Sequence, residues 1–152
     1  MVLTLMAIIS AAVVPVFSSS LSGLKQKDTL RNLVSLIQFV QEKAVSESRV
    51  YRICFDTKAQ TYWVMEPAEE PTEDQPYDVV QDSYGRPRKL PTGMEFRAVR
   101  ARTDRVDRYD YFECYPNGAS DELTLTFDFP NDRSRRAKIS VEGMMGRVEL
   151  VE

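Results

Sequence analysis

Carboxylates are the side chains of this sequence most able to do chemistry, because seven of them fall between Glu66 and Asp82 with no basic residue among them. A carboxylate can act as a general acid or base when burial or a neighbouring charge shifts its pKa. The stretch PAEEPTEDQP, residues 67–76, is too acidic and too rich in proline to pair within a sheet. It predicts a mobile surface loop without such burial, and its carboxylates lack the regular spacing and turn glycine of a calcium-binding loop.

The sequence also lacks the residues of other common catalytic and cofactor-binding sites. The chain contains no histidine, which removes Ser-His and Cys-His nucleophile pairs and the commonest metal ligand. Residues 143–146 hold two glycines in what reads as a hairpin turn, and this is no phosphate-binding loop. We therefore expect no enzyme activity, no cofactor and no metal site, and we expect surface pockets to be shallow.

The first seventeen residues, MVLTLMAIISAAVVPVF, are apolar except for Thr4 and Ser10, and no charged residue occurs before Lys25. A helix that is apolar all round belongs in lipid or in the centre of a helical bundle. At about 1.5 Å per residue the segment reaches roughly 25 Å, slightly less than the ~30 Å hydrocarbon layer of a bilayer. A cleaved signal peptide is the alternative, but it would have a basic leader and a structural break after its cleavage site, which are not seen. We expect residues 1–24 to form a transmembrane or filament-core helix.

The helix is expected to continue into a folded domain, residues 25–152. Leu30, Leu33, Ile37, Val40 and Ala44 recur at spacings of three and four, which is the period of an amphipathic helix. The opposite face carries polar side chains, with the glutamine at position 41 among them. One long helix, bent at the proline of the apolar segment, fits both halves.

Beyond the helix the periodicity becomes alternating, as in half-buried strands. YRICFD (51–56) and TYWVME (61–66) read as a hairpin, and MEFRAVRAR and RYDYFECY read as the strands of a second block. LTLTFDF (123–129) alternates most clearly, and the segments after it continue as an antiparallel meander. The order predicts an α+β fold in which the helix packs on antiparallel β-sheets.

The formal net charge of −3 gives no general reason to expect nucleic-acid binding. Its distribution is uneven, because residues 66–82 are acidic whereas residues 86–108 contain eight bases and three acids. We expect these neighbouring stretches to be solvated loops that offset each other by partial ion pairing.

In this order of elements the chain resembles type IV pilin-like proteins. ISAAVVPVF looks like the pilin transmembrane helix with its proline, and LRNLVSLIQFVQEKAVSESRVYRICFD is similar to the helix-to-first-strand passage of the minor pseudopilins of the GspH/FimT family. KLPTGMEF, the turn FECYPNGAS and the ending KISVEGMMGRVEL resemble the same family. The basic leader, the Gly-Phe cleavage site and the early glutamate of such precursors are not seen, so we expect a truncated N-terminus and assign no processing site.

The resemblance implies a pilin-like fold and a structural role. It implies a minor pseudopilin in the tip or priming complex of a type II secretion pseudopilus, which supports protein export. The protein would be a single-pass inner-membrane protein with a periplasmic domain that is assembled into a periplasmic filament. It would contact other pseudopilins or pilins through its N-terminal helix. Its other partners would be the inner membrane and secreted cargo. The residues expected to pack in the membrane or filament are Leu3, Leu5, Ile8, Ile9, Val13, Pro15 and Phe17.

A FimT-like minor pilin of a type IV pilus, with a role in DNA uptake or adhesion, is the alternative that the resemblance leaves open. Nucleic-acid contacts would then fall on basic side chains that can neutralise phosphates. The candidates are Arg133, Arg135, Arg136 and Lys138. The chain ends in the acidic sequence GRVELVE, which argues against DNA binding, so nucleic acid is not the partner we expect.

Cys54 and Cys114 are the two cysteines of the chain. Outside the cytoplasm two cysteines in a small domain usually pair, and strands at 50–56 and 108–115 could be neighbours. A disulfide closing a loop of about 60 residues would stabilise the fold by roughly 4 kcal/mol. Two separate buried thiols remain the alternative, because the pattern does not establish which way each strand faces.

Exposed aromatic or apolar side chains beside loops are typical anchors of protein interfaces. Four residues fit this description and form the candidate partner surface, with an ordinary core or turn role as the alternative. They are Tyr77, Tyr84, Met144 and Met145.

Overall fold

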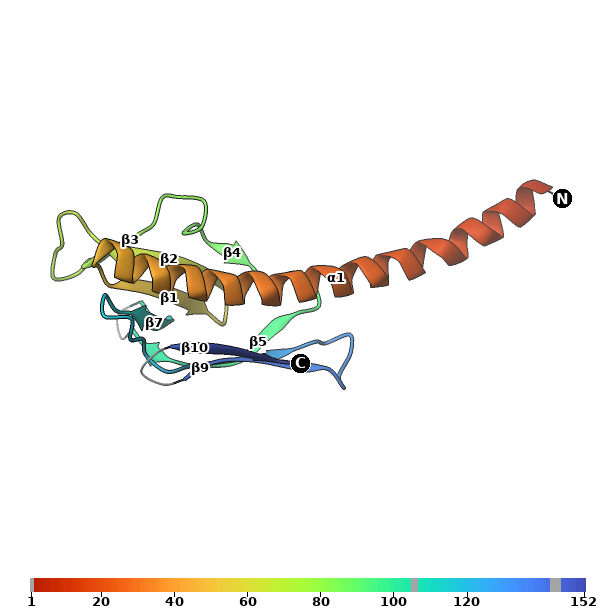
Figure 1. The fold of residues 1–152 in the computed structure, drawn as a ribbon. Helices are drawn as coiled ribbons and strands as arrows, with labels where there is room; N and C mark the ends of the chain where they lie inside the picture. The colour runs from red at the N-terminus through yellow and green to blue at the C-terminus, as the bar shows by residue number, and fades with distance from the viewer. Residues whose placement is uncertain (1, 105–106, 143–145) are drawn as a thin grey trace.

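The computed structural model describes residues 2–104, 107–142 and 146–152, and the side chains of its helix from Ser22 onward. A single helix, α1 (Val2–Glu47), precedes all the strands of the described chain (Figure 1). The strands are β1 (Tyr51–Asp56), β2 (Thr61–Pro67), β3 (Tyr77–Val79), β4 (Arg88–Lys89), β5 (Glu95–Arg100), β6 (Arg102–Thr103), β7 (Asp110–Cys114), β8 (Leu123–Asp128), β9 (Arg136–Glu142) and β10 (Arg147–Val151). The expected α+β composition is confirmed.

The strands form two antiparallel sheets. The first sheet has the order β3-β2-β1-β7-β6, with β4 also paired to β2, and the second has the order β10-β9-β8-β5. The predicted hairpin and the C-terminal meander are both present, through the β1–β2, β8–β9 and β9–β10 pairs. The segment MEFRAVRAR differs from the expected single strand, because β5 pairs with β8 in the second sheet while β6 pairs with β7 in the first.

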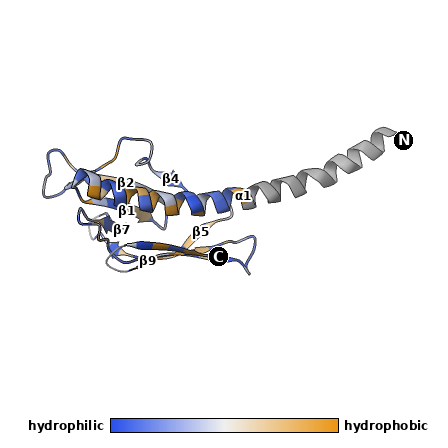
Figure 2. Cartoon of the chain, viewed as in Figure 1, coloured by the Kyte–Doolittle hydropathy of each residue, from blue (hydrophilic) through white to orange (hydrophobic). Residues whose placement is uncertain are grey.

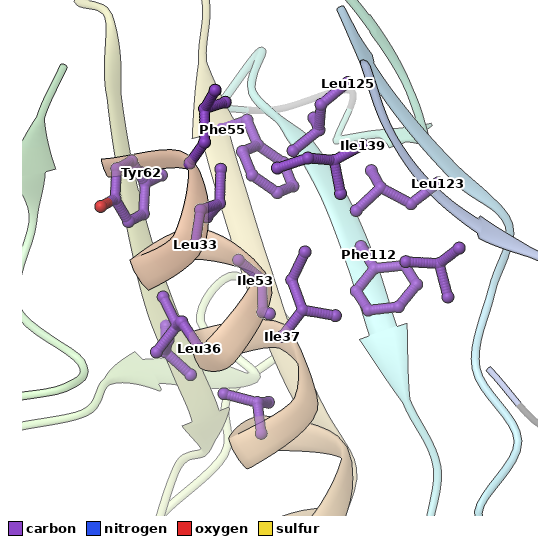
Figure 3. Packing of buried hydrophobic residues seen from close by; sticks show 14 of the residues in the cluster. Leu33, Leu36, Ile37, Ile53, Phe55, Tyr62, Phe112, Leu123, Leu125 and Ile139 are labelled. Carbon is purple, nitrogen blue, oxygen red and sulfur yellow. The ribbon is translucent and has the colours of Figure 1, made fainter. Parts of the chain in front are cut away.

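The helix covers the core with the predicted apolar stripe. Leu30, Leu33, Ile37, Val40 and Ala44 are all fully buried. They pack against apolar side chains of both sheets, and Figure 3 shows Leu33 and Ile37 pointing toward residues of β1, β7, β8 and β9. Apolar and polar residues alternate along this part of α1 (Figure 2). Burial of each such leucine or isoleucine contributes about 1.5–3 kcal/mol, so this stripe holds helix and sheets together.

Two glutamines fasten the helix to loops of the domain. Gln26 is only 6% exposed, and its Nε2 donates a hydrogen bond to the Gly93 carbonyl oxygen at 3.0 Å. Nε2 of Gln41 donates to the Gly146 carbonyl oxygen at 2.8 Å. Gly146 has a φ of 60°, and a Cβ at this position would lie 2.4 Å from Nε2 of Gln41. Gln41 is therefore half-buried between the helix and a turn, which corrects its assignment to the solvent face.

Short segments cover the outer edge of β2. Strands β3 and β4 pair with its two ends, and between them the Val64 amide donates to the Gly85 carbonyl oxygen at 3.1 Å. The Val80 amide donates to the Val64 carbonyl oxygen at 3.0 Å. A Cβ at residue 85 would lie 2.3 Å from Cβ of Val80, so this turn fits against β2 only with glycine there. Sequence periodicity did not indicate these short pieces.

Within the part of the chain whose side chains are described, no helix combines the length and the apolar character needed to cross a bilayer. The residues expected to pack in the membrane or filament, from Leu3 to Phe17, lie in the stretch of α1 outside those described side chains.

Candidate functional site

The outer face of the first sheet carries an arginine held between two tyrosines. In β1 the residues that point away from α1 are Arg52 and Cys54, since their neighbours Ile53 and Phe55 are in the core. The guanidinium carbon of Arg52 lies 3.7 Å from the ring centroid of Tyr77 and 4.4 Å from that of Tyr111. The predicted partner residue Tyr77 is thus half-buried against a cation.

Glu113 lies opposite Arg52 on the neighbouring strand β7 and binds it through a hydrogen bond. Its side chain is 8% exposed, and it accepts hydrogen bonds from Nε of Arg52 at 2.8 Å, from Nη1 of Arg102 at 2.9 Å and from the Tyr115 hydroxyl at 3.0 Å. Burial acts to lower the pKa of Arg52, but the hydrogen bond to Glu113 and the nearby tyrosines outweigh this effect and raise it. We define Arg52, Tyr77, Tyr111 and Glu113 as the outer-face cluster. The sequence did not lead us to expect a buried, paired carboxylate. Glu113 holds Arg52 in place, and it lines none of the main surface hollows.

Tyr84 lies on the other side of the molecule, beside the helix. Its ring makes an edge contact with Phe39, with centroids 5.0 Å apart, and Nζ of Lys43 lies 5.5 Å from the same ring. Phe39 is 45% exposed, so the pair forms a partly exposed aromatic contact beside α1, of which only Tyr84 was named from the sequence. The other two predicted partner residues, Met144 and Met145, lie outside the described residues.

The segment 67–76, which we name the acidic loop, is a surface loop as predicted. The Ala68 amide donates to the Pro76 carbonyl oxygen at 3.1 Å and closes the loop at its base. Its carboxylates are exposed, and among the described residues none of them forms an ion pair with the basic stretch 86–108. The acidic residues of the loop are Glu69, Glu70, Glu73 and Asp74.

A hollow of about 380 Å³ lies beside this loop and is lined by Tyr77, Tyr109, Asp104 and Asp107, among others. Within the described ranges, no three histidine, cysteine or acidic residues are grouped so that they could hold a metal ion.

Three of the four basic residues proposed for nucleic-acid contact line a second hollow, of about 340 Å³, at the turn between β8 and β9. They are Arg133, Arg135 and Arg136, while Lys138 is exposed further along β9. The hollow, which we name the arginine hollow, is also lined by Glu95, Arg97, Asp128, Phe129 and Pro130. Arg135 lies over the Phe129 ring at 4.4 Å, and its Nη2 is 3.3 Å from Oε1 of Glu152. The lining thus combines four arginines with two acidic side chains.

The cysteines lie on neighbouring strands, as predicted, but they do not form a disulfide. Both are free, buried thiols. Cys114 pairs in register with Tyr51 and faces the core, whereas Cys54 lies three residues along β1 on the outer face. An offset of three residues corresponds to about 10 Å along the strand, beyond the Cα separation of ~7 Å that a disulfide tolerates. Of the two alternatives, the structure contains the separate thiols.

Comparison with known proteins identifies the fold. No family model matches the sequence, and no curated protein matches it by sequence. The minor pseudopilin EpsH from the type 2 secretion system of Vibrio cholerae superposes with a TM-score of 0.66 at 12% identity, covering 84% of this chain and 96% of that chain. The type IV minor pilin FimU of Pseudomonas aeruginosa gives a TM-score of 0.53 at 13% identity, covering 83% and 92%. The resemblance to minor pseudopilins is therefore confirmed at the level of the fold.

Proposed function

We propose that this chain is a minor pseudopilin, a structural subunit in the tip or priming complex of a type II secretion pseudopilus that supports protein export. One observation carries the proposal: the two-sheet domain built on the apolar stripe of α1 is similar in fold to EpsH over 96% of the EpsH chain in that structure. Subunits of this kind act by contact and not by chemistry. The surfaces described above suit contact, because they present fixed aromatic rings and charged loops.

We further propose that residues 1–24 anchor the protein as a single-pass inner-membrane and filament-core helix, with residues 25–152 as the periplasmic domain. The absence of any charge before Lys25 supports this proposal. Other pilin-like subunits would pack against the apolar helix, and secreted cargo would meet the domain. The packing residues would be Leu3, Leu5, Ile8, Ile9, Val13, Pro15 and Phe17.

Deletion and complementation of the gene in its own host test these proposals. Deletion should lower the amount of type II substrate in the culture medium, and the full chain should restore it. Ile9→Arg should fail to restore secretion, because a charge at the centre of a membrane helix costs about 2.5–3.5 kcal/mol of insertion free energy. Ser35→Arg, which places the same residue on the exposed face of α1, is the matched control and should complement.

Normal secretion in the deletion strain would contradict the type II assignment. Loss of DNA uptake or adhesion in the same strain would instead support the second candidate, a FimT-like minor pilin of a type IV pilus. The arginine hollow favours that candidate, since guanidinium groups bind phosphates. Salt-dependent retention of the protein on DNA is the measurement that separates the two functions.

A further inference from the structure

We propose that one end of the domain binds the anionic phospholipid headgroups of the membrane in which the N-terminal helix is anchored. This end, which we name the basic end, is formed by residues 22–31 of α1 and by residues 128–138, which join β8 to β9. The inference rests on the proposed anchoring of residues 1–24 and deepens it, because it names the surface through which the unassembled subunit would rest on the bilayer.

The basic end lies where the helix leaves the sheets on its way to the N-terminus (Figure 1). Nη1 of Arg135 donates a hydrogen bond of 3.3 Å to Oε1 of Gln26. Ser22 and Gly23 on the helix line one hollow of about 540 Å³ together with Phe129 and other residues of the turn. The turn is therefore level with the helix segment that follows the apolar run, while the acidic loop after β2 lies at the other end of the domain (Figure 1).

The distance from this turn to the expected membrane is short. Phe17 closes the apolar run, and Gln26 follows nine residues later, or about 14 Å along the helix axis. The headgroups of one leaflet occupy about 5–7 Å outside the hydrocarbon layer. With Phe17 at the edge of the hydrocarbon, the turn beside Gln26 stands roughly 7–9 Å above the headgroups. This is within the Debye length of about 10 Å at 0.1 M salt, so its charges would act on the membrane surface.

Bases outnumber acids at the basic end by seven to three, although the whole chain has 20 bases and 23 acids. Of these seven bases only Arg135 forms an ion pair within the described structure. Ammonium and guanidinium groups both bind phosphate, and guanidinium can do so through two hydrogen bonds at once. The six unpaired bases are all exposed, and they are Lys25, Lys27, Arg31, Arg133, Arg136 and Lys138.

The acids at or beside the basic end do not cancel this charge. Two of the five are already paired within the chain, because Asp128 lies 3.3 Å from Arg97 and Glu152 lies 3.3 Å from Arg135. Three unpaired acids thus stand against six unpaired bases, and the free charge of this end is positive. The acids without an ion pair among the described residues are Asp28, Glu95 and Asp132.

Two exposed apolar side chains belong to the same surface. Leu24 is 60% exposed and Val151 is 59% exposed, more than Phe39 or Val45 elsewhere on the domain. Val151 pairs in register with Lys138, which places it at the basic end. Apolar side chains flanked by basic ones are typical of protein segments that lie on a membrane, where the apolar groups enter the boundary between headgroups and acyl chains. The composition of this surface therefore suits a bilayer.

A bilayer suits the basic end better than a nucleic acid does. Duplex DNA carries one phosphate charge per about 1.7 Å of its axis in a fixed arrangement. Asp28, Glu95 and Asp132 interrupt the basic surface and would repel some of those phosphates. Lipid headgroups are separate molecules that diffuse in the plane of the membrane, so anionic ones can gather at the bases and leave the acids to neutral ones.

Fluorescence of the full chain in lipid nanodiscs tests this contact. Ser134→Cys places one reactive thiol in the turn, because the native thiols are buried, and an environment-sensitive dye attached there reports on the headgroup layer. The dye emission should shift to the blue in discs that mix phosphatidylglycerol with phosphatidylcholine, compared with discs of phosphatidylcholine alone. The control label, attached through Glu70→Cys in the exposed acidic loop, should give the same emission in both kinds of disc.

Charge removal then tests which residues make the contact. Arg133→Gln combined with Arg136→Gln should lower the ratio of docked to free domains about 25-fold, since each base near an anionic surface contributes about fivefold. The matched control combines Arg49→Gln with Arg147→Gln, which removes the same charge at exposed positions outside the basic end, and it should keep the shift. Raising the salt concentration from 0.1 to 1 M should abolish the shift, because the Debye length falls from about 10 to about 3 Å.

Four results would overturn the proposal. Equal emission in the two kinds of disc, from a chain that still co-elutes with them, would refute the lipid contact and leave the membrane anchor intact. A chain that does not co-elute with the discs would refute the anchor itself. A shift that persists without Arg133 and Arg136 would show that their charges do not hold the domain on the membrane. Binding of duplex DNA that is lost in the same variant, without any response to anionic lipid, would show that the basic end serves nucleic acid.

Discussion

Removal of the charge of Glu113 should destabilise the domain, although this residue contributes nothing to the apolar core. Glu113→Gln keeps the size of the side chain but replaces one acceptor oxygen by a donor that faces Arg52 or Arg102. The Arg52 side chain is 15% exposed, and a hydrogen bond to a charged group in such surroundings contributes about 1.5–3 kcal/mol. The Arg102 side chain is 54% exposed, so its ion pair is screened by solvent and adds about 0–1 kcal/mol. The expected loss in the free energy of unfolding is about 1.5–4 kcal/mol.

Urea unfolding of the full chain in a mild detergent measures this loss. The single tryptophan, Trp63, is a suitable reporter because it packs on the outer face of the same sheet, with its ring centroid 5.2 Å from that of Tyr109. Glu149→Gln, the same substitution at an exposed position of β10, is the control and should change the free energy by no more than about 0.5 kcal/mol.

A loss for Glu113→Gln no larger than that of the control would refute the reasoning. It would mean that desolvation of the carboxylate cancels what its ion pairs contribute, which happens for some buried pairs. A double-mutant cycle with Arg52→Met would then measure the remaining coupling directly.

Three further predictions follow from packing and titration. Ile37→Ala should lower the free energy of unfolding by about 2–5 kcal/mol, because it leaves a cavity between helix and sheets, and the same change at an exposed position of α1 should have little effect. Burial raises the pKa of Cys54 and of Cys114, so a thiol reagent at mildly alkaline pH should label neither in the folded protein and both in urea; rapid labelling of the native state would disprove their burial. The hydrogen bond from Lys43 lowers the pKa of Glu47 below its ordinary value of 4.5, so its stabilising contribution is complete above that value and is lost as the pH falls through the lowered pKa. Glu47→Gln should flatten the acid limb of the stability curve, and an unchanged limb would contradict the assignment.

Strong periodicity made much of the fold predictable. The stripe from Leu30 to Ala44 and the alternation from Leu123 to Phe129 each identify a buried face within a single element, and both are confirmed. Periodicity says nothing about which sheet a strand joins. The chain therefore changes sheets between Arg100 and Arg102 without any sequence signal, because the change depends on pairing with β8 and with β7, which follow later in the chain.

The candidate site was less predictable, because it depends on which side chains meet across strands. Tyr77 and Tyr84 were proposed as partner residues from their type and their place beside loops, and their contacts with Arg52 and Lys43 were not predicted. Neither Arg52 nor Glu113 was predicted from the sequence to be part of a site. The available signal was Tyr111, an aromatic residue on the same face as Arg52, which indicates that this face is covered. For Cys54 and Cys114, adjacency of the strands was predictable but the offset between them was not.

The covered edge of β2 bears on how such a chain can polymerise. An open strand edge presents unpaired amide and carbonyl groups that recruit any other open edge, and this is the route to disordered β-aggregation. Along β2 these groups are occupied by β3, by β4 and by the turn that contains Gly85. Backbone pairing at this edge, which would accept almost any sequence, is thereby closed to neighbouring copies. Recognition between subunits on this side of the domain is left to side chains, and side chains can tell one partner from another.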